Sequence, residues 1–303
     1  MSKYCDAMRL VIVGGGCAGY SAAVCAARNN VDVTLITGND IGGQLAKATV
    51  VDNVPGFNVM TGDDFMDKLR SHALEFGTNM IEDEVTYMEF NQHPFRVLTD
   101  HSGTVVADRI IIATGKSFNS LNIGSEKKFI GRGVSYCVTC DGRFYKNRVV
   151  CVVGSGDSAV KAAIFLSKIA HDVKLLVRGD RLKASAYNKN ELKTRSNIDV
   201  IFNTNVIDIC GDGLVEYIVV DRCGKQENIS TDGVFVMVGS NPNTELFNGF
   251  IELDERGYII TDDHCRTNIK WVYAAGDVQS SAYKQAPIAM GNGYTAAMAC
   301  QED

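Results

Sequence analysis

The 303-residue sequence lacks the features of several protein classes. It has no uninterrupted apolar run of the roughly 18 residues that span a membrane, so we expect no transmembrane segment. It also has no basic excess: 30 Lys and Arg stand against 36 Asp and Glu, and a net charge of -6 argues against nucleic acid or an anionic membrane as the main partner. A strand pattern begins at Arg9, which leaves no room for a signal peptide. These absences favour a cytoplasmic protein.

The sequence also lacks a repeated cysteine spacing. Its ten cysteines are scattered, and a single CxxC pair, Cys137 and Cys140, is found among them. A zinc site would need a second pair of Cys or His ligands, so we expect no metal. Other cysteines, such as Cys17 and Cys151, stand among apolar residues and are expected to be buried free thiols. The close pair, followed at once by Asp141, indicates a redox dithiol instead.

What the sequence contains is one motif used twice. Each copy reads as a buried strand, a glycine-rich turn, a helix and a second strand, and Gly154 follows Gly14 at an offset of 140 residues (154 - 14). The predicted elements are strand 10–13, helix 17–28 and strand 32–36, then strand 149–153, helix 157–169 and strand 172–177. Continuous runs of Val, Ile and Leu are typical of parallel strands buried on both faces. The sequence therefore predicts an α/β fold with two Rossmann-like, three-layer dinucleotide-binding domains.

Both turns carry the residues that a dinucleotide site needs. Glycines let a pyrophosphate approach the backbone, and the following helix offers N–H donors and the positive end of its dipole. The key positions are Gly14, Gly16 and Gly19 in the first loop and Gly154, Gly156 and Ala159 in the second. For one loop alone, a tight turn in which glycines serve only packing is the alternative. Two copies in register favour nucleotide binding.

The segments after the second strands lack the acidic residue that selects NAD. The first copy continues as Thr37-Gly38-Asn39, whereas the second is followed by Arg178 and then Lys183, cations that suit a ribose 2′-phosphate. A solvated surface charge is the alternative for Arg178. Another buried strand ends shortly before Asp277, whose carboxylate suits a sugar-like hydroxyl or a helix N-cap.

Taken in order, these motifs resemble the low-molecular-weight thioredoxin reductases over nearly the whole chain. The segment Cys137-Val138-Thr139-Cys140-Asp141-Gly142 between two nucleotide-binding motifs is the most specific feature. The other matching segments are 14–19, 42–45, 53–56, 113–115, 132–135, 154–159, 239–244, 275–277 and 283–286. The resemblance implies a thioredoxin-disulfide reductase, which passes two electrons from NADPH through FAD to the Cys137–Cys140 pair and on to oxidised thioredoxin.

The resemblance also implies how the chain is organised. Residues 1–115 and 245–303 would form a discontinuous FAD-binding domain, and residues 116–244 an inserted NAD(P)H-binding domain that carries the dithiol. Family members are homodimers in which the inserted domain rotates, so hinges are expected near 115–117 and 243–245. Cys140 would exchange electrons with the flavin, Cys137 would attack the substrate disulfide, and Asp141 would move the proton. A turn or helix-capping carboxylate is the alternative for Asp141.

The same resemblance assigns the cofactor contacts. FAD would be bound by Gly14, Gly16, Gly19, Gly43, Gln44, Leu45, Asn53, Ala113, Thr114, Gly115, Gly276, Asp277, Gln285 and Ala286. NADPH would be bound by Gly154, Gly156, Asp157, Ser158, Ala159, Arg178 and Lys183.

The chain departs from the family in the segment expected to bind the nicotinamide nucleotide. The family's His-Arg-Arg reads Val177-Arg178-Gly179 here, and Lys183 replaces a further Arg without its bidentate fork. NADH and reduced ferredoxin therefore remain alternative donors. A flavin-dependent dithiol oxidase that uses oxygen and a non-catalytic redox sensor are the other classes considered. The second glycine loop argues against the oxidase, and the complete dithiol and both loops argue against the sensor.

Overall fold

The computed structural model describes residues 8–48 and 50–303. The chain divides into two compact units: unit 1 comprises Met1–Ser117 and Asn241–Asp303, and unit 2 comprises Phe118–Ser240. The chain thus leaves unit 1 after Ser117 and returns to it at Asn241. The crossings lie near the two-stranded sheet of β8 (Lys116–Phe118) and β17 (Ser240–Pro242).

Unit 1 is built on a five-stranded parallel sheet of order β18-β7-β1-β2-β3. Its strands are β1 (Arg9–Val13), β2 (Asp32–Ile36), β3 (Asn79–Ile81), β7 (Arg109–Ile112) and β18 (Val272–Ala274). Alternate residues of β1 serve two separate cores: Leu10 and Ile12 pack on one face, and Val11 and Val13 on the other. The sheet is therefore covered on both sides, as its continuous apolar strands predicted.

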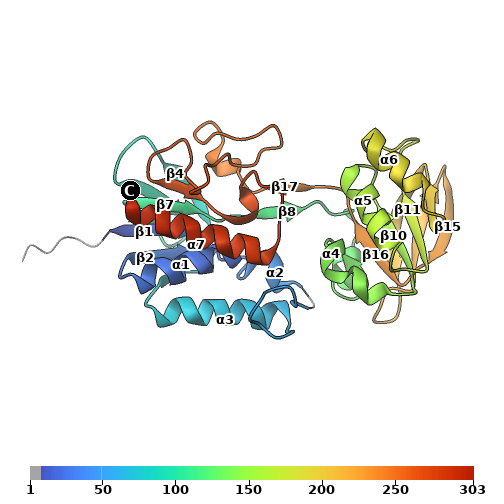
Figure 1. Ribbon diagram of the computed structural model, residues 1–303, viewed down its shortest axis with the longest axis horizontal. Helices are drawn as coiled ribbons and strands as arrows, with labels where there is room; N and C mark the ends of the chain where they lie inside the picture. The colour runs from blue at the N-terminus through green and yellow to red at the C-terminus, as the bar shows by residue number, and fades with distance from the viewer. Residues whose placement is uncertain (1–7, 49) are drawn as a thin grey trace, which may run out of the picture. The chain divides into compact units, whose positions relative to one another are not determined.

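Helices cover one face of this sheet and a small antiparallel sheet covers the other. The helical layer contains α1 (Cys17–Arg28), α2 (Gly43–Ala46), α3 (Gly62–Glu75) and α7 (Ala286–Glu302). Figure 1 shows α7 alongside α1, and a Cβ added to Gly293 would lie 2.1 Å from the Ala18 carbonyl oxygen, so only glycine permits this approach. The opposite layer is β4 (Val85–Glu89), β5 (Phe95–Thr99) and β6 (Thr104–Ala107).

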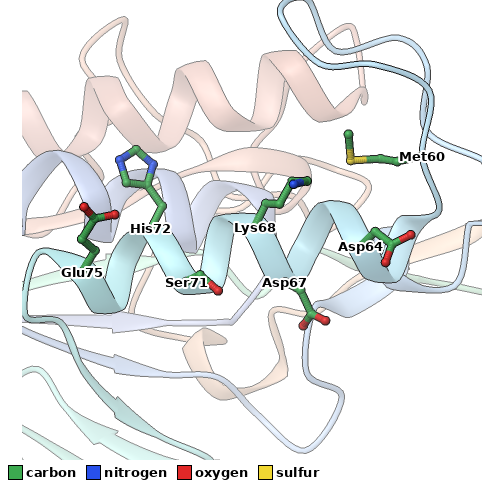
Figure 2. Close-up of a pocket in the computed structure, with 7 residues that line it drawn as sticks. All are labelled: Met60, Asp64, Asp67, Lys68, Ser71, His72 and Glu75. Atoms are coloured by element: carbon green, nitrogen blue, oxygen red, sulfur yellow. The ribbon is translucent and has the colours of Figure 1, made fainter.

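Helix α3 is amphipathic, and its outer face is open. Thr61 caps the helix by accepting from Asp64 N at 3.2 Å, while Phe65 and Leu69 face the core. The hollow in Figure 2 runs along the other face and is lined by Met60, Asp64, Asp67, Lys68, Ser71, His72 and Glu75. None of these is a predicted site residue, and their mixed charges are those of a solvated helix face.

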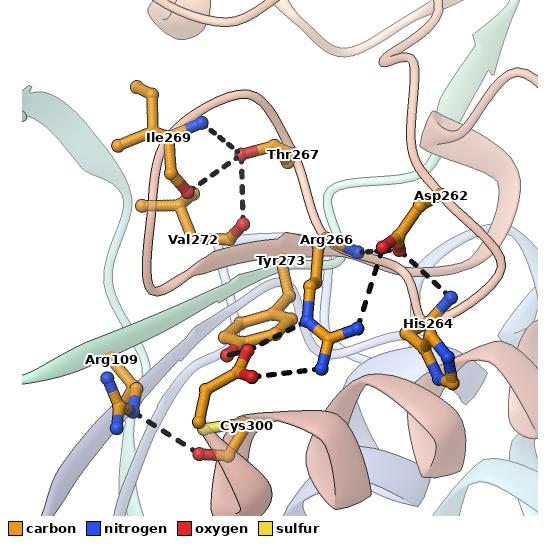
Figure 3. A network of polar contacts seen from close by, with 10 residues as sticks. Arg109, Asp262, His264, Arg266, Thr267, Ile269, Val272, Tyr273 and Cys300 are labelled. Atoms are coloured by element: carbon orange, nitrogen blue, oxygen red, sulfur yellow. Dashed lines mark hydrogen bonds and ion pairs between the residues drawn. The ribbon is translucent and has the colours of Figure 1, made fainter.

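A polar network ties α7 to the sheet (Figure 3). The Arg266 guanidinium donates to both carboxylate oxygens of Asp303, at 2.8 and 2.9 Å, and the Tyr273 hydroxyl donates to one of them at 2.7 Å. Arg109 Nε donates to the Cys300 carbonyl at 3.2 Å. The bonds from Arg266 and Tyr273 lower the pKa of Asp303 from 3.8 to about 2, with the Arg266 bond the main cause.

Unit 2 repeats the layered plan. Its parallel sheet has the order β12-β11-β10-β16-β9, formed by β9 (Val134–Ser135), β10 (Val149–Val153), β11 (Asp172–Leu176), β12 (Ile198–Ile201) and β16 (Gly233–Val236). One core contains residues of α4 (Val138–Asp141), α5 (Asp157–Leu166) and α6 (Ala186–Lys193). The other lies under β13 (Thr204–Cys210), β14 (Tyr217–Arg222) and β15 (Lys225–Ser230).

The predicted α/β class with two Rossmann-like units is confirmed, with small differences at element ends. Helix α5 stops at Leu166, three residues before the predicted 169. The Asn197 side-chain amide donates to the carbonyls of Ser167 and Ala170, so these carbonyls are satisfied by a side chain instead of a continuing helix. Cys17 and Cys151 are buried free thiols, as predicted. Within the described residues, no helix combines the length and apolarity needed to cross a bilayer.

Candidate redox and nucleotide sites

The dithiol lies at the start of α4 in unit 2. Cys137 is the N-cap, and its Sγ is joined to Cys140 Sγ in a disulfide of S–S length 2.10 Å. Cys140 N donates to Cys137 Sγ at 3.3 Å, and the Thr139 hydroxyl lies 3.5 Å from the same sulfur. A backbone N–H at a helix start stabilises negative charge on its acceptor. The geometry therefore favours Cys137 as the sulfur that carries the thiolate when the pair is reduced.

Asp141 lies one turn from Cys137 and is half-buried. Its Oδ2 accepts from the Ser135 hydroxyl at 2.6 Å, and Ser135 Oγ in turn accepts from Cys137 N at 3.0 Å. Burial raises the pKa of Asp141, and the Ser135 bond partly opposes that rise. The side chain makes no capping bond at the 3-10 helix Gly142–Tyr145 that follows. A carboxyl with a raised pKa next to a dithiol is suited to giving and taking a proton.

Phe144 is a feature of this region that the sequence reasoning missed. It lies three residues after Asp141, its side chain is exposed, and the Arg143 guanidinium lies 4.6 Å from its ring centroid. Aromatic residues and arginines are enriched where proteins meet other proteins. Its only signal in the sequence is an aromatic residue just after the CxxC motif.

The three glycines of the first loop play different parts. A Cβ on Gly14 would lie 2.3 Å from the Ala113 carbonyl oxygen, and one on Gly19 would lie 1.9 Å from the Gly14 carbonyl oxygen. A Cβ on Gly16 would meet nothing within 4 Å, and α1 begins after Gly16 without a side-chain cap. The outer glycines therefore serve packing, whereas the space before the α1 N–H groups is open. That arrangement fits a pyrophosphate.

Other predicted FAD residues gather around this loop. Gly43, at the start of α2 with Gln44 and Leu45, approaches Gly16, because its Cβ would lie 3.8 Å from Gly16 Cα. A Cβ on Gly276 would lie 2.8 Å from the Ala18 side chain.

The turn of Ala113, Thr114 and Gly115 is held by the returning chain. Thr114 Oγ1 donates to the Asn243 carbonyl and Asn243 Nδ2 donates to the Thr114 carbonyl, both at 2.7 Å. Asn243 N also donates to the Gly115 carbonyl at 3.0 Å. These bonds hold the turn against the segment by which the chain returns to unit 1.

Asn53, Gln285 and Asp277 lie on loops of unit 1. Asn53 Nδ2 donates to Gln285 Oε1 at 2.9 Å, and Gln285 is the N-cap of α7, with Ala286 as the first helical residue. Asp277 lies in the 3-10 helix Gly276–Val278, whose N-cap is Ala275, so the alternative of a helix N-cap is wrong for Asp277. Its Oδ2 lies 3.6 Å from Lys116 Nζ.

Lys284 also belongs to this region; it lies in the matching segment 283–286, but no role was predicted for it. Its Nζ donates to the carbonyls of Asp277 and Gln279 and lies 4.3 Å from the Tyr258 ring centroid. Burial lowers the pKa of the Lys284 ammonium to about 8. Lys284 therefore clamps the turn that presents Asp277.

The second loop repeats the pattern of the first. A Cβ on Gly154 would lie 2.4 Å from the Met237 carbonyl oxygen, whereas one on Gly156 would meet nothing within 4 Å. Ala159, in place of a third glycine, is fully buried, and α5 begins after Gly156 without a side-chain cap. Exposed Ser158 lies in its first turn. The open space before α5 again fits a dinucleotide phosphate.

Asp157 is engaged within the protein. Its Oδ1 accepts from Ser185 N and Ser185 Oγ, each at 2.9 Å, and from the Asn188 side-chain amide. These bonds, led by the Ser185 backbone N–H, lower the pKa of Asp157. Asp157 therefore joins the start of α5 to the start of α6.

Arg178 and Lys183 lie on the exposed loop between β11 and α6. Lys183 N donates to the Ser155 carbonyl at 2.8 Å, which brings this loop against the second glycine loop. Neither side chain has an ion-pair partner within the described part of the chain. Both cations are thus available to an anionic ligand at the carboxyl end of the sheet.

Comparison with known proteins gives one consistent family. Residues 8–293 match the pyridine nucleotide-disulphide oxidoreductase family. A thioredoxin reductase from Escherichia coli is 40% identical over 303 residues, covering 96% of this chain and 94% of its own. A protein from Pseudomonas fluorescens named glucosaminate ammonia-lyase is 39% identical over 301 residues, covering 96% and 93%. The solved thioredoxin reductase from Giardia duodenalis has a TM-score of 0.91 at 32% identity, covering 97% of both chains.

Proposed function

This chain belongs to the pyridine nucleotide-disulphide oxidoreductase family, and on that premise we propose that it is a thioredoxin-disulfide reductase. The observation that carries the proposal is the Cys137–Cys140 disulfide at the start of α4, with Asp141 beside it, in the unit that also holds the second glycine loop. Flavin and pyridine nucleotide use follows from the family. The homodimeric state and the cytoplasmic location that the resemblance implies remain part of the proposal.

We assign FAD to unit 1 and NADPH to unit 2. The open space at Gly16 supports the first assignment. The second is supported by the open space at Gly156 and by the loop that carries Arg178 and Lys183, which is bonded to the second glycine loop. When bound, FAD supplies two-electron reduction of the Cys137–Cys140 disulfide. The chain's own residues then perform thiol–disulfide exchange with the protein substrate.

In the reduced pair, the Cys137 thiolate attacks one sulfur of the thioredoxin disulfide. A mixed disulfide forms, and the other thioredoxin sulfur leaves as a thiolate that takes up a proton. The Cys140 thiolate then attacks Cys137 Sγ, which restores the intramolecular disulfide and releases the second thioredoxin thiolate for protonation. Asp141 gives and takes these protons. Exposed Phe144 offers an apolar contact for the protein substrate.

The relative named glucosaminate ammonia-lyase raises a second activity. Elimination of ammonia involves no net transfer of electrons to a partner, so it does not require a redox disulfide. The disulfide at the start of α4 therefore favours the reductase. Ammonia release from glucosaminate by the purified protein would support the lyase instead.

The donor and the dithiol are tested separately. The anaerobic flavin-loaded protein is mixed with NADPH, NADH or reduced ferredoxin while flavin absorbance is followed, and we expect NADPH to bleach the flavin. If only ferredoxin bleaches it, the pyridine nucleotide assignment is wrong. Cys137→Ser should keep flavin bleaching and lose thioredoxin reduction, and retained turnover would overturn the role of Cys137.

A further inference from the structure

Glu126 is a buried carboxylate near the dithiol segment. It lies in the 3-10 helix Glu126–Phe129 and is 1% exposed. The Tyr136 hydroxyl donates to its Oε1 at 2.8 Å, and Leu121 N donates to its Oε2 at 2.8 Å. Within the described residues, no cation pairs with it. A buried polar group costs stability relative to an apolar side chain, which points to a task other than stabilising the fold.

The two donors come from separate parts of unit 2. Leu121 lies three residues after Phe118, where the chain enters unit 2, and Tyr136 directly precedes Cys137. The Tyr136 ring also stacks on the Phe118 ring, with centroids 5.3 Å apart and an interplanar angle of 16°. Glu126 and Tyr136 therefore connect the entry segment of unit 2 to the residue beside the dithiol.

The residues before Cys137 are held from two sides. Ser135 binds the Asp141 carboxylate, and the next residue, Tyr136, binds the Glu126 carboxylate. Ser135 is the last residue of β9 and Tyr136 lies in the bend that follows, so the two carboxylates hold adjacent residues of one short segment. Cys137 follows directly, and its own N–H is bound to Ser135 Oγ at 3.0 Å.

We propose that Glu126 and Tyr136 are positioning residues for the Cys137–Cys140 pair. They fix the segment that places Cys137 Sγ against Cys140 N–H, and they transmit the position of the entry segment to the dithiol. The inference deepens the proposed reductase function and rests on it. A hydrogen bond that only stabilises the fold would leave thiol reactivity unchanged, so reactivity separates the two roles.

The test uses Tyr136→Phe, which keeps the ring stack, Glu126→Gln, which keeps the shape, and the double variant. Tyr217→Phe, in β14 of the same unit, is the matched control. The full-length protein is reduced with dithiothreitol, and alkylation of Cys137 by iodoacetamide is followed by mass spectrometry of its peptide. The contact of Cys137 Sγ with Cys140 N–H should loosen, so we expect alkylation of Cys137 at pH 7 to slow about fivefold, with no change in the control. A fivefold change corresponds to the net free energy of about one hydrogen bond.

Turnover provides the second readout. We expect each single variant to lower kcat for thioredoxin about tenfold with KM unchanged, because a misplaced nucleophile slows chemistry more than binding. The double variant should lose no more of its kcat than the less active single variant does, since both substitutions act through one contact. Unchanged alkylation and kcat, with only a lower unfolding temperature, would overturn the inference. The alkylation assay needs neither thioredoxin nor NADPH, so failure of the proposed function would not disguise failure of this proposal.

Discussion

Replacing Asp141 with Asn removes a proton-transfer group while keeping its shape. The Ser135 hydroxyl, which donates to Asp141 Oδ2 at 2.6 Å, can donate equally to the Asn carbonyl oxygen, so the segment beside Cys137 should stay in place. A positioned acid or base contributes about a hundredfold to ten-thousandfold to rate. Asp141 is only half-buried, and water can replace it in part. We therefore expect the single-turnover rate of thioredoxin reduction to fall about a hundredfold, near the lower limit of that range.

The assay isolates the proton-transfer step from the supply of electrons. The reduced protein is mixed with oxidised thioredoxin under anaerobic conditions, and a single turnover is followed across a range of pH. Asp232→Asn is the matched control, because this carboxylate lies in the same unit but binds Arg148 and the Val149 N–H.

The pH dependence of the single-turnover rate tests whether Asp141 acts as an acid. Burial raises the pKa of Asp141 and the Ser135 bond lowers it, so Ser135→Ala should raise it further. An acid loses its proton as pH rises through its pKa, and the alkaline decline of the Asp141-dependent rate should therefore move to higher pH in Ser135→Ala. A single-turnover rate for Asp141→Asn within threefold of the unmodified protein would refute the proton-transfer role.

Four further predictions address the nucleotide sites, the substrate and stability. Gly16→Val should leave folding intact but abolish FAD retention, because its side chain would fill open space, whereas Gly19→Ala should unfold unit 1 because its Cβ would lie 1.9 Å from a carbonyl oxygen; absorbance and circular dichroism distinguish them. Arg178→Ala should raise KM for NADPH about tenfold and leave KM for NADH unchanged, as steady-state kinetics would measure. Phe144→Ala should raise KM for thioredoxin about tenfold with kcat unchanged. The pKa of Asp303 is lowered from 3.8 to about 2, so its bonds stabilise the fold above pH 3.8 and are lost as pH falls toward 2; the stability difference from Asp303→Asn should shrink over that interval in thermal unfolding experiments.

The sequence predicted the parts of the fold that repeat a local pattern. Strand, glycine turn and helix follow each other without a gap in both copies, so periodicity and glycine position were enough to place β1, α1, β10 and the start of α5. The antiparallel layers β4–β6 and β13–β15 carry no such motif. Their cover of each parallel sheet depends on contacts far along the chain.

The candidate site divides in the same way. The dithiol and glycine loops are local motifs, whereas the buried state of Glu126 and the half-buried ammonium of Lys284 arise from tertiary packing. Asp157 shows that a motif does not predict all the contacts of a residue within it. Its position after Gly156 indicated a nucleotide contact, but its bonds to Ser185 and Asn188 depend on a helix that begins almost thirty residues later.

The discontinuity of unit 1 has a consequence for the order in which the chain acquires structure during synthesis. Both cores of unit 2 contain only residues between Phe118 and Ser240, so this unit can close as soon as Ser240 has left the ribosome. Unit 1 cannot, because β18 pairs with β7 and α7 packs on α1. Its amino-terminal half must wait, with apolar surface uncovered, until the last helix emerges. We therefore expect the inserted unit to fold first on the ribosome and the nascent amino-terminal half to be the segment that chaperones protect.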